Sequence, residues 1–596
     1  MLYRLISLVF LLHVINFSYA LSADEIFILP KEKPSIFKKI NKNTLNQQVI
    51  LPTKKPKKKE EIKVKKKEKI EIKQQQVKIK SSFIFPKEKP ESYKVVKRTQ
   101  RSSEILSKKD FDKAKKVFKF IKEKKWTSAL RITEKVKDKD FKNLVNWIYL
   151  KTTSNNASFS DYQKFIEKNS DYPRISRLQY LAEHKIYLKS NSPSVIINWF
   201  EKYPPVSGMG KLKLAEALQK KGNNVNIENL VKEGWTTASI SKTNLSYYRS
   251  KFKKILTYDD HIKRSDYLAW ETKYWDLKRM LRYLPKDERA LYNARQILMS
   301  NSYGVDKSIS NVPGHLKNNV GLEYDRLKWR NRRGRTEQSL EILYDNANKS
   351  EEELIRGDLW WKQRESVSRS LIYKKRYKTA YKVASEHSLT SGPHFAEAEW
   401  LSGWIALTFL KSPEYAINHF NNFYKNVGYP ISLARGAYWL GKSYKILGDK
   451  INSEKFFLEG AKFLTTYYGQ LSFNEVNNQK DFSLNDETFV DKNYQKEFDK
   501  NELVNHVLLL QELDATKYTK DIIKHLAKLN IEKGSEVLAA KLATEVERYD
   551  FAIQISKQAS YEKRFYNKYN YPIINTPKTI NNKTMPNQEV VLAIIR

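Results

Sequence analysis

The sequence of 596 residues contains no cysteine. Disulfide frameworks, thiolate zinc sites, iron–sulfur clusters and cysteine nucleophiles are therefore excluded for these residues. Glycine and proline are scarce, with 18 of each, which excludes collagen-like chains and argues against an all-β chain crowded with turns. Acidic residues are outnumbered, because 67 Asp and Glu face 110 Lys and Arg, and the formal net charge is +43. Hydrophobic residues make up 40% of the chain, which is enough for a large buried core.

The basic excess is concentrated in one segment near the N-terminus. Residues 31–101 hold 24 Lys and Arg but only 7 Asp and Glu, so +17 of the net charge lies there. A run such as Lys54–Lys59 cannot bury enough apolar surface to order itself. We therefore expect residues 21–102 to form a disordered, lysine-rich linker. It would act either as an electrostatic tether to an anionic polymer or lipid headgroups, or as a solvated spacer.

The first twenty residues resemble an export signal. Arg4 precedes an apolar run over residues 5–15, and Ser18 and Ala20 follow at the spacing that a signal peptidase recognises. This pattern predicts a signal peptide over residues 1–20 and a location in the periplasm; the alternative is an uncleaved anchor. No later segment reaches 18 consecutive apolar residues, so we expect no integral membrane span after cleavage. Export also makes nucleic acid an unexpected partner, despite the basic charge.

From residue 103 onward the hydrophobic pattern is helical. Ala114, Val117, Phe118 and Ile121 recur at the spacing of one helix face. Similar stripes continue along the chain, with no convincing run of alternating residues that would predict a strand. The aromatic side chains in these stripes are interpreted as packing residues of a helical core, and not as a cofactor site.

The clearest repeat lies late in the sequence. Gly403 and Gly441 stand 38 residues apart, each on the first helix of a predicted pair, and Phe420 and Phe457 lie on the partner helices. A small residue lets paired helices approach closely, and an aromatic residue fills the space between them. The spacing is close to that of tetratricopeptide repeats, and the sequence therefore predicts an all-α fold of stacked helical pairs.

Motifs for catalysis and metal binding are not found. The nine histidines are scattered without a His-Glu-x-x-His pattern, and there is no phosphate-binding glycine loop or Gly-x-Ser-x-Gly elbow. His387 and His394 flank Gly392-Pro393, for which we predict a role in a loop. Glu351–Glu353 is interpreted as the acidic first turn of a helix.

One basic cluster in the predicted folded part is a candidate binding site. Arg330, Arg332, Arg333 and Arg335 lie within six residues. Guanidinium groups bind carboxylates well, so these arginines could hold the carboxylates of a bound polymer. The alternative is a loop that faces solvent and binds nothing.

Five segments carry a pattern in a fixed order, namely residues 194–218, 303–335, 385–410, 430–449 and 461–473. Together they resemble the soluble lytic murein transglycosylases, in the form typical of alphaproteobacteria. The run Thr465-Thr466-Tyr467-Tyr468-Gly469-Gln470-Leu471 is the most diagnostic part. The five segments follow the family's order, and the resemblance extends over residues 105–596.

The resemblance implies a fold, a substrate and a location. It implies a ring-like or U-shaped α-superhelix of tetratricopeptide-like pairs over residues 103–470, and a smaller helical linker domain over residues 471–585. The enzymes of this family cleave the β-1,4 bond between N-acetylmuramic acid and N-acetylglucosamine in peptidoglycan, leaving a 1,6-anhydro end. They are periplasmic and need no cofactor or metal. The implied partners are glycan strands, with other cell-wall enzymes as further candidates.

The last residues match the start of the family's lysozyme-like domain. Residues 586–596 are expected to begin its first helix, and in the family this helix leads into Gln-Glu-Ser, whose Glu is the catalytic acid and base. That position would lie just beyond Arg596, so the chain alone is expected to be inactive and able at most to bind or position murein. The alternative is a non-enzymatic periplasmic helical-repeat protein that binds partners or serves as a scaffold.

Overall fold

The computed structural model describes residues 102–223, 226–300, 303–477, 484, 488–573, 579–580, 583–584 and 587–595. The chain divides into residues 1–89 and residues 90–596. All described residues belong to the second part, which we call the helical unit. The signal peptide predicted for residues 1–20 and the lysine-rich linker predicted for residues 21–102, apart from Ser102, lie outside the described residues.

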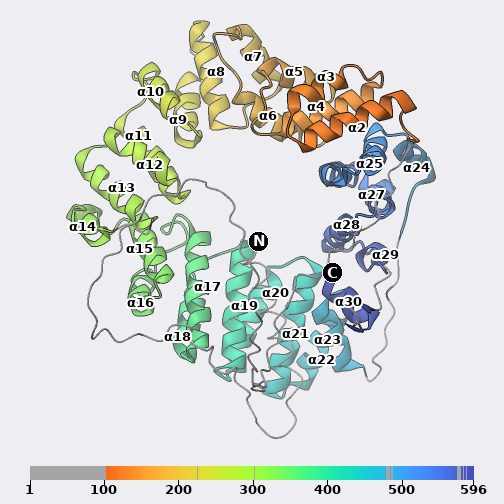
Figure 1. The fold of residues 1–596 in the computed structure, drawn as a ribbon. Coiled ribbons are helices and arrows are strands. Elements are labelled where there is room, and N and C mark those ends of the chain that lie inside the picture. The colour runs from red at the N-terminus through yellow and green to blue at the C-terminus, as the bar shows by residue number, and fades with distance from the viewer. Residues whose placement is uncertain are drawn as a thin grey trace, which may run out of the picture. The chain divides into compact units, whose positions relative to one another are not determined.

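The described part of the helical unit consists of α-helices joined by short connections (Figure 1). The first helices are α2 (Lys108–Lys122), α3 (Trp126–Thr133), α4 (Lys139–Lys151), α5 (Phe159–Lys168), α6 (Ile175–Glu183), α7 (Pro193–Lys202), α8 (Gly208–Lys220), α9 (Ile227–Thr237) and α10 (Lys242–Lys251). The next are α11 (Tyr258–Trp270), α12 (Tyr274–Met280), α13 (Lys286–Leu298), α14 (Val305–Ser310), α15 (Val320–Arg332) and α16 (Thr336–Asp345).

The second half continues in the same way. Its longer helices are α17 (Gly357–Tyr373), α18 (Tyr377–Ser385), α19 (Gly392–Thr408), α20 (Pro413–Lys425), α21 (Pro430–Leu447), α22 (Lys450–Ala461) and α23 (Tyr467–Val476). The last are α24 (Lys492–Asp499), α25 (Glu502–Glu512), α26 (Thr519–Leu526), α27 (Ser535–Glu545), α28 (Tyr549–Tyr561), α29 (Asn567–Asn570) and α30 (Gln588–Ile595). Short 3-10 helices cover Leu281–Tyr283, Gly314–Leu316, Thr516–Tyr518 and Ile531–Lys533. The strands β1 (Thr579–Ile580) and β2 (Lys583–Thr584) pair antiparallel, and the all-α class is confirmed.

Consecutive helices pack as pairs, as the glycine and phenylalanine spacing predicts. A Cβ atom at Gly403 on α19 would lie 2.7 Å from the ring of Phe420 on α20. At Gly441 on α21, a Cβ would lie 2.8 Å from the ring of Phe457 on α22. No side chain fits at either distance, so glycine is required for the close approach of each pair. The predicted pairing and its two small-to-large contacts are confirmed.

Contacts between segments far apart in the sequence join the two ends of the helical unit. Helix α25 packs against α4. Lys151 Nζ of α4 forms an ion pair of 2.8 Å with Asp521 of α26. The Tyr172 hydroxyl and His506 Nε2 of α25 share a buried hydrogen bond of 2.9 Å.

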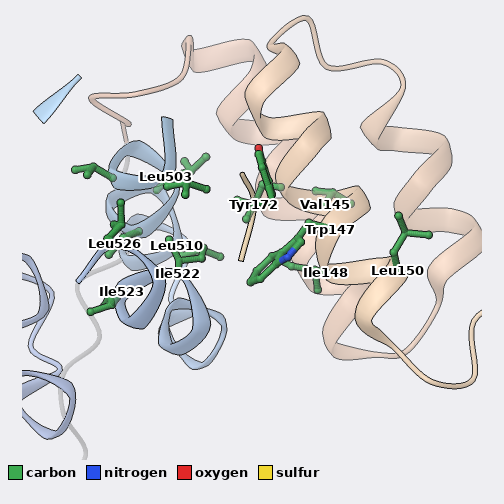
Figure 2. Close-up of a cluster of buried hydrophobic side chains, with 14 of the residues drawn as sticks. Val145, Trp147, Ile148, Leu150, Tyr172, Leu503, Leu510, Ile522, Ile523 and Leu526 are labelled. Atoms are coloured by element: carbon green, nitrogen blue, oxygen red, sulfur yellow. The ribbon is translucent and has the colours of Figure 1, made fainter. Parts of the chain in front are cut away.

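The same junction contains a continuous hydrophobic cluster. Side chains from the first helices and from α25–α28 belong to one buried core. Figure 2 shows Trp147 and Tyr172 between α4 and the helices that carry Leu510 and Ile522. Burial of apolar surface supplies most of the stabilisation at such a contact. Helices α25–α28 therefore share a core with the first helices of the unit.

His506 makes the stability of this junction depend on pH. Burial lowers the pKa of His506 to about 4, compared with about 6.5 in an unfolded chain. Between these values the unfolded chain binds a proton that the folded chain excludes, so stability falls as the pH falls. We expect the helical unit to lose about 2 kcal/mol of stability at this group between pH 7 and pH 5.

Urea unfolding at the two pH values, followed by circular dichroism, measures this loss. The variant His506→Gln should show a smaller difference between pH 7 and pH 5. Burial also lowers the pKa values of His184, His261 and His525, so part of the pH dependence should remain. An equal loss in the variant and the parent chain would contradict the role of His506.

Two further observations concern local structure. Glu351–Glu353 lies in a turn before α17 begins at Gly357, so its prediction as the first turn of a helix is wrong. The Glu353 carboxylate accepts the Ser350 N–H and stabilises this turn. Within the part of the chain that the structure describes, no helix is both long and apolar enough to cross a membrane.

Candidate functional site

The predicted arginine cluster lies at the end of α15 and in the turn to α16. Arg330 and Arg332 belong to the last turn of α15, Arg333 follows it, and Arg335 precedes α16. Between them, Gly334 has a φ of +68° with no atom near its Cα that would contact a side chain. Glycine adopts this left-handed conformation at little cost, and the tight turn keeps the arginines close together.

A cavity of about 360 Å³ adjoins this cluster. We call it the basic pocket. It lies among α13, α14, α15 and α16; α13 contacts both α14 and α15, and α15 contacts α16. Its lining residues are Leu298, Val305, Asp306, Ile309, Ser310, Lys317, Leu322, Arg326, Trp329, Arg330, Arg335 and Gln338.

One face of α15 forms the side of the pocket. Leu322, Arg326, Trp329 and Arg330 follow one another at intervals of four, three and one residues. This spacing places them on the same side of an α-helix. This helix face therefore combines two large apolar side chains, Leu322 and Trp329, with two basic ones, Arg326 and Arg330.

The charge of the pocket is positive. Four of its lining residues are cationic, namely Lys317, Arg326, Arg330 and Arg335, and only Asp306 is acidic. Burial and the neighbouring charge of Arg326 lower the pKa of Arg330. Arginine nevertheless stays protonated in proteins, so the two like charges repel each other across one turn of α15.

The four cations differ in how far their charge is neutralised. Arg330 Nη1 donates to the Gln338 carbonyl oxygen at 2.6 Å and forms an ion pair of 3.5 Å with Glu341. Arg326 makes no hydrogen bond or ion pair with the described residues, and its Nε is shielded from solvent without an acceptor. Arg326 is thus the least satisfied cation of the pocket.

Trp329 forms part of the pocket wall and also contacts arginines. Its side chain is 8% exposed, and its buried Nε1 has no hydrogen-bond partner. The guanidinium carbon of Arg335 lies 4.8 Å from the centre of the ring, and that of Arg333 lies 4.5 Å from it. These are cation–π distances, and they hold both arginines near the aromatic face.

The structure separates the four predicted arginines into two groups. Arg330 and Arg335 line the basic pocket, and Arg332 and Arg333 do not. Arg332 donates to the carbonyl oxygens of Leu298 at 2.6 Å and Met299 at 3.3 Å. These carbonyls end α13, where a cation is favourable because of the helix dipole. Arg332 therefore joins α15 to α13 and is assigned a structural role.

Arg326 and Trp329 also line the pocket but are not part of the basic cluster predicted from the sequence. The signal for Arg326 was present, since it lies four residues before Arg330 and one turn away on a helix. The predicted cluster rests on proximity in the sequence, so it includes Arg332, which binds carbonyl groups of α13, and Arg333, which stacks on Trp329 without lining the pocket.

A second buried polar cluster joins α19 and α20. Glu399 is hydrogen-bonded to His387 Nε2 at 3.1 Å and to His419 Nδ1 at 2.7 Å. Burial acts to raise the pKa of Glu399, but the hydrogen bonds to both histidines outweigh it and lower the pKa to about 2. His387 Nδ1 also accepts the Leu389 N–H at 3.0 Å. His387 is buried, and it lies in the connection between α18 and α19, as the sequence predicts. His394 lies in the first turn of α19 instead of the loop.

The basic pocket is suited to binding an anion and not to proton transfer. Its one carboxylate, Asp306, is exposed to solvent. Among the residues that the structure describes, no group of three or more His, Asp and Glu could hold a metal ion. An apolar wall with a few convergent cations is typical of a site for a small organic anion.

Comparison with solved structures finds proteins with a similar fold. The 70-kDa soluble lytic transglycosylase of Escherichia coli matches 82% of this chain and 76% of its own, with a TM-score of 0.54 and 11% identity. In fold, this chain is similar to soluble lytic transglycosylases. An inactive mutant of the lytic transglycosylase Slt from Pseudomonas aeruginosa matches 75% of this chain and 70% of its own, with a TM-score of 0.51 and 15% identity.

A third similar structure contains a ligand. It is a complex of the 70-kDa soluble lytic transglycosylase with bulgecin A, with a TM-score of 0.54, 12% identity, and coverage of 82% of this chain and 76% of that one. No protein-family model and no curated protein sequence matches this chain. At these identities the similarity establishes the superhelical all-α fold that the sequence predicts.

Proposed function

We propose that this chain is part of a murein-directed protein of the lytic transglycosylase type that works in the periplasm. The similarity in fold over 82% of the chain carries the proposal. The proposed reaction is that of the family the sequence resembles, cleavage of the bond between N-acetylmuramic acid and N-acetylglucosamine with formation of a 1,6-anhydro end. Within this protein, the helical unit binds and positions glycan strands.

Charge supports murein as the substrate. The residues outside the lysine-rich segment 31–101 carry the remaining +26 of the net charge. Murein contains lactyl and peptide carboxylates, so a basic helical unit attracts it through contacts that salt weakens. The same attraction makes an anionic polymer a better partner than a neutral polysaccharide.

Catalysis is proposed to lie outside residues 103–585. Cleavage of a glycosidic bond requires a carboxylic acid that stays protonated until it donates to the leaving oxygen. The buried carboxylate Glu399 has a pKa of about 2 and is ionised at neutral pH. Asp306, the carboxylate of the basic pocket, is exposed to solvent. In this proposal the helical unit is assigned binding, and the chemistry is assigned to a lysozyme-like domain such as that of the family the sequence resembles.

Binding to purified murein sacculi tests the proposal. We expect the purified chain to sediment with sacculi at low salt and to be released at high salt, because screening weakens contacts between exposed charges. Chitin, which lacks carboxylates, is the control and should retain little protein. Equal retention on chitin, or no retention on sacculi at low salt, would contradict a murein-binding role.

Analysis of the soluble products separates the proposed roles. The alternative function, a non-enzymatic periplasmic binding or scaffold protein, is favoured by the shortage of proton donors around the basic pocket. Both functions include binding to sacculi. Release of anhydro-muropeptides by the chain with residues 1–585 alone would contradict the placement of catalysis outside the helical unit.

A further inference from the structure

We propose that the basic pocket binds a free carboxylate of a short peptide attached to murein, with Arg326 and Arg335 as its binding groups. The identity of the peptide rests on the murein function proposed above. The preference for a carboxylate on an apolar body rests on the pocket itself.

The first observation is that the pocket contains cationic side chains that no neighbouring acidic side chain neutralises. Arg335 and Lys317 line the pocket and, like Arg326, form no ion pair with the described residues. Glu341 partly neutralises Arg330 alone. The pocket therefore keeps an excess of positive charge that its own side chains do not balance.

The second step is the arrangement of two like charges on one helix face. Arg326 and Arg330 lie one turn apart on α15, and each carries a guanidinium group that lines the cavity. Like charges at this spacing destabilise a helix slightly. A carboxylate bound by Arg326 reduces this repulsion, and it accepts charge-assisted hydrogen bonds from Arg326 and Arg335, which are stronger than neutral ones.

The third step concerns buried donors without acceptors. Trp329 Nε1 and Arg326 Nε are both shielded from solvent and unpaired. A buried donor that makes no hydrogen bond costs free energy. Both side chains line the pocket, so the wall on this side of α15 contains donors that the described side chains do not satisfy.

The size and lining select the kind of anion. A cavity of about 360 Å³ is at the small end of the range for organic ligands, roughly 300–1,000 Å³. That volume suits a few residues of a peptide better than a glycan strand. Leu298, Val305, Ile309 and Leu322 offer an apolar wall, which an aliphatic peptide side chain covers and inorganic phosphate does not.

Isothermal titration calorimetry with the full chain tests the inference. The probe is a purified disaccharide–tripeptide muropeptide with free carboxylates, and the comparison probe is the same compound with its carboxylates converted to methylamides. We expect the first to bind and the second to bind at least about tenfold more weakly, since each charge-assisted hydrogen bond contributes at this level. Equal binding of the two probes would overturn the inference.

Matched arginine variants assign the binding groups. Arg326→Gln and Arg335→Gln should each weaken muropeptide binding by about tenfold. Arg333→Gln is the control, because Arg333 stacks on the same tryptophan but lies outside the pocket. Circular dichroism checks that each variant folds. Unchanged binding in Arg326→Gln and Arg335→Gln, or an equal loss in Arg333→Gln, would overturn the inference.

Two further measurements keep this inference distinct from the proposed function. Inorganic phosphate is added as a competitor, and displacement of the muropeptide at equal concentration would identify a general anion site and overturn the peptide assignment. The three variants are also tested on sacculi. If the parent chain is retained on sacculi but the variants bind the muropeptide as well as the parent does, the pocket assignment is rejected and the murein function is not. If the parent chain is not retained on sacculi at low salt, the murein function is rejected.

Discussion

Replacing Arg295 by methionine is expected to lower the free energy of unfolding of the helical unit by about 3–5 kcal/mol, because the change leaves a buried carboxylate without its partner. The Arg295 side chain on α13 is 0% exposed. Its Nε donates to Asp325 of α15 at 2.8 Å, and its Nη1 donates to Asp266 of α11 at 2.6 Å. Burial opposes the charge on Arg295, but the two carboxylates outweigh it and raise its pKa.

Close backbone packing makes this network hard to rearrange. A Cβ atom at Gly321, near the start of α15, would lie 2.4 Å from the guanidinium carbon of Arg295. Helix α15 therefore rests directly on the guanidinium group, and little space is left for water to reach Asp325. An unpaired charge in such a place is much more costly than the loss of an exposed ion pair.

Urea unfolding and amide hydrogen exchange in α13 and α15 measure the effect. The double variant Arg295→Met with Asp325→Leu is the control, because it removes both buried charges and should recover most of the lost stability. A double variant as unstable as Arg295→Met would show that shape, and not the unpaired charge, causes the loss. A single variant with an unchanged urea midpoint would contradict the prediction.

Replacing Trp147 by alanine is expected to cost about 3–5 kcal/mol through loss of buried surface and formation of a cavity. The side chain is 0% exposed and lies in the cluster that α4 shares with α25 and α26 (Figure 2). Its Nε1 donates to the Pro173 carbonyl oxygen at 2.8 Å, and Lys151 Nζ lies 3.6 Å from the ring centre. The change therefore removes packing, a hydrogen bond and a cation–π contact together.

The effect should concentrate at the junction of the two ends of the helical unit. Hydrogen exchange should accelerate most in α4 and α25, and the urea midpoint should fall. Trp275→Ala is the matched control, because this tryptophan is 65% exposed and surface substitutions usually change stability by less than about 0.5 kcal/mol. Equal shifts in the two variants would contradict a special role for Trp147 in joining the ends.

The pairing of neighbouring helices could be predicted because it depends on local spacing. Gly403 and Phe420, and Gly441 and Phe457, are separated by fewer than twenty residues. Their contact follows from the helical period and a short connection. The prediction for Glu351–Glu353 failed for a related reason. An acidic run suits the first turn of a helix, and Ser350 and Glu353 exchange the hydrogen bonds of a helix cap. Ile355, however, has a φ of +63°, so the turn does not continue as a helix.

The candidate site could be predicted only in part. The sequence located a basic cluster between residues 330 and 335, and two of its four arginines line the basic pocket. The partners of Arg332 are carbonyl groups some thirty residues earlier in the sequence, so no local pattern could identify them. The same holds for Glu399, whose low pKa depends on His387 and His419 from either side.

The sequence by itself determined the all-α class, the helical pairs and the basic character of the chain, because these depend on composition and on periods of a few residues. Only the tertiary structure decided which arginines face a cavity and which hold helices together. It also decided that α25 packs on α4, more than 350 residues away. A contact of this kind requires the summed geometry of all the helices between its partners, and no pattern within a single helix specifies that sum.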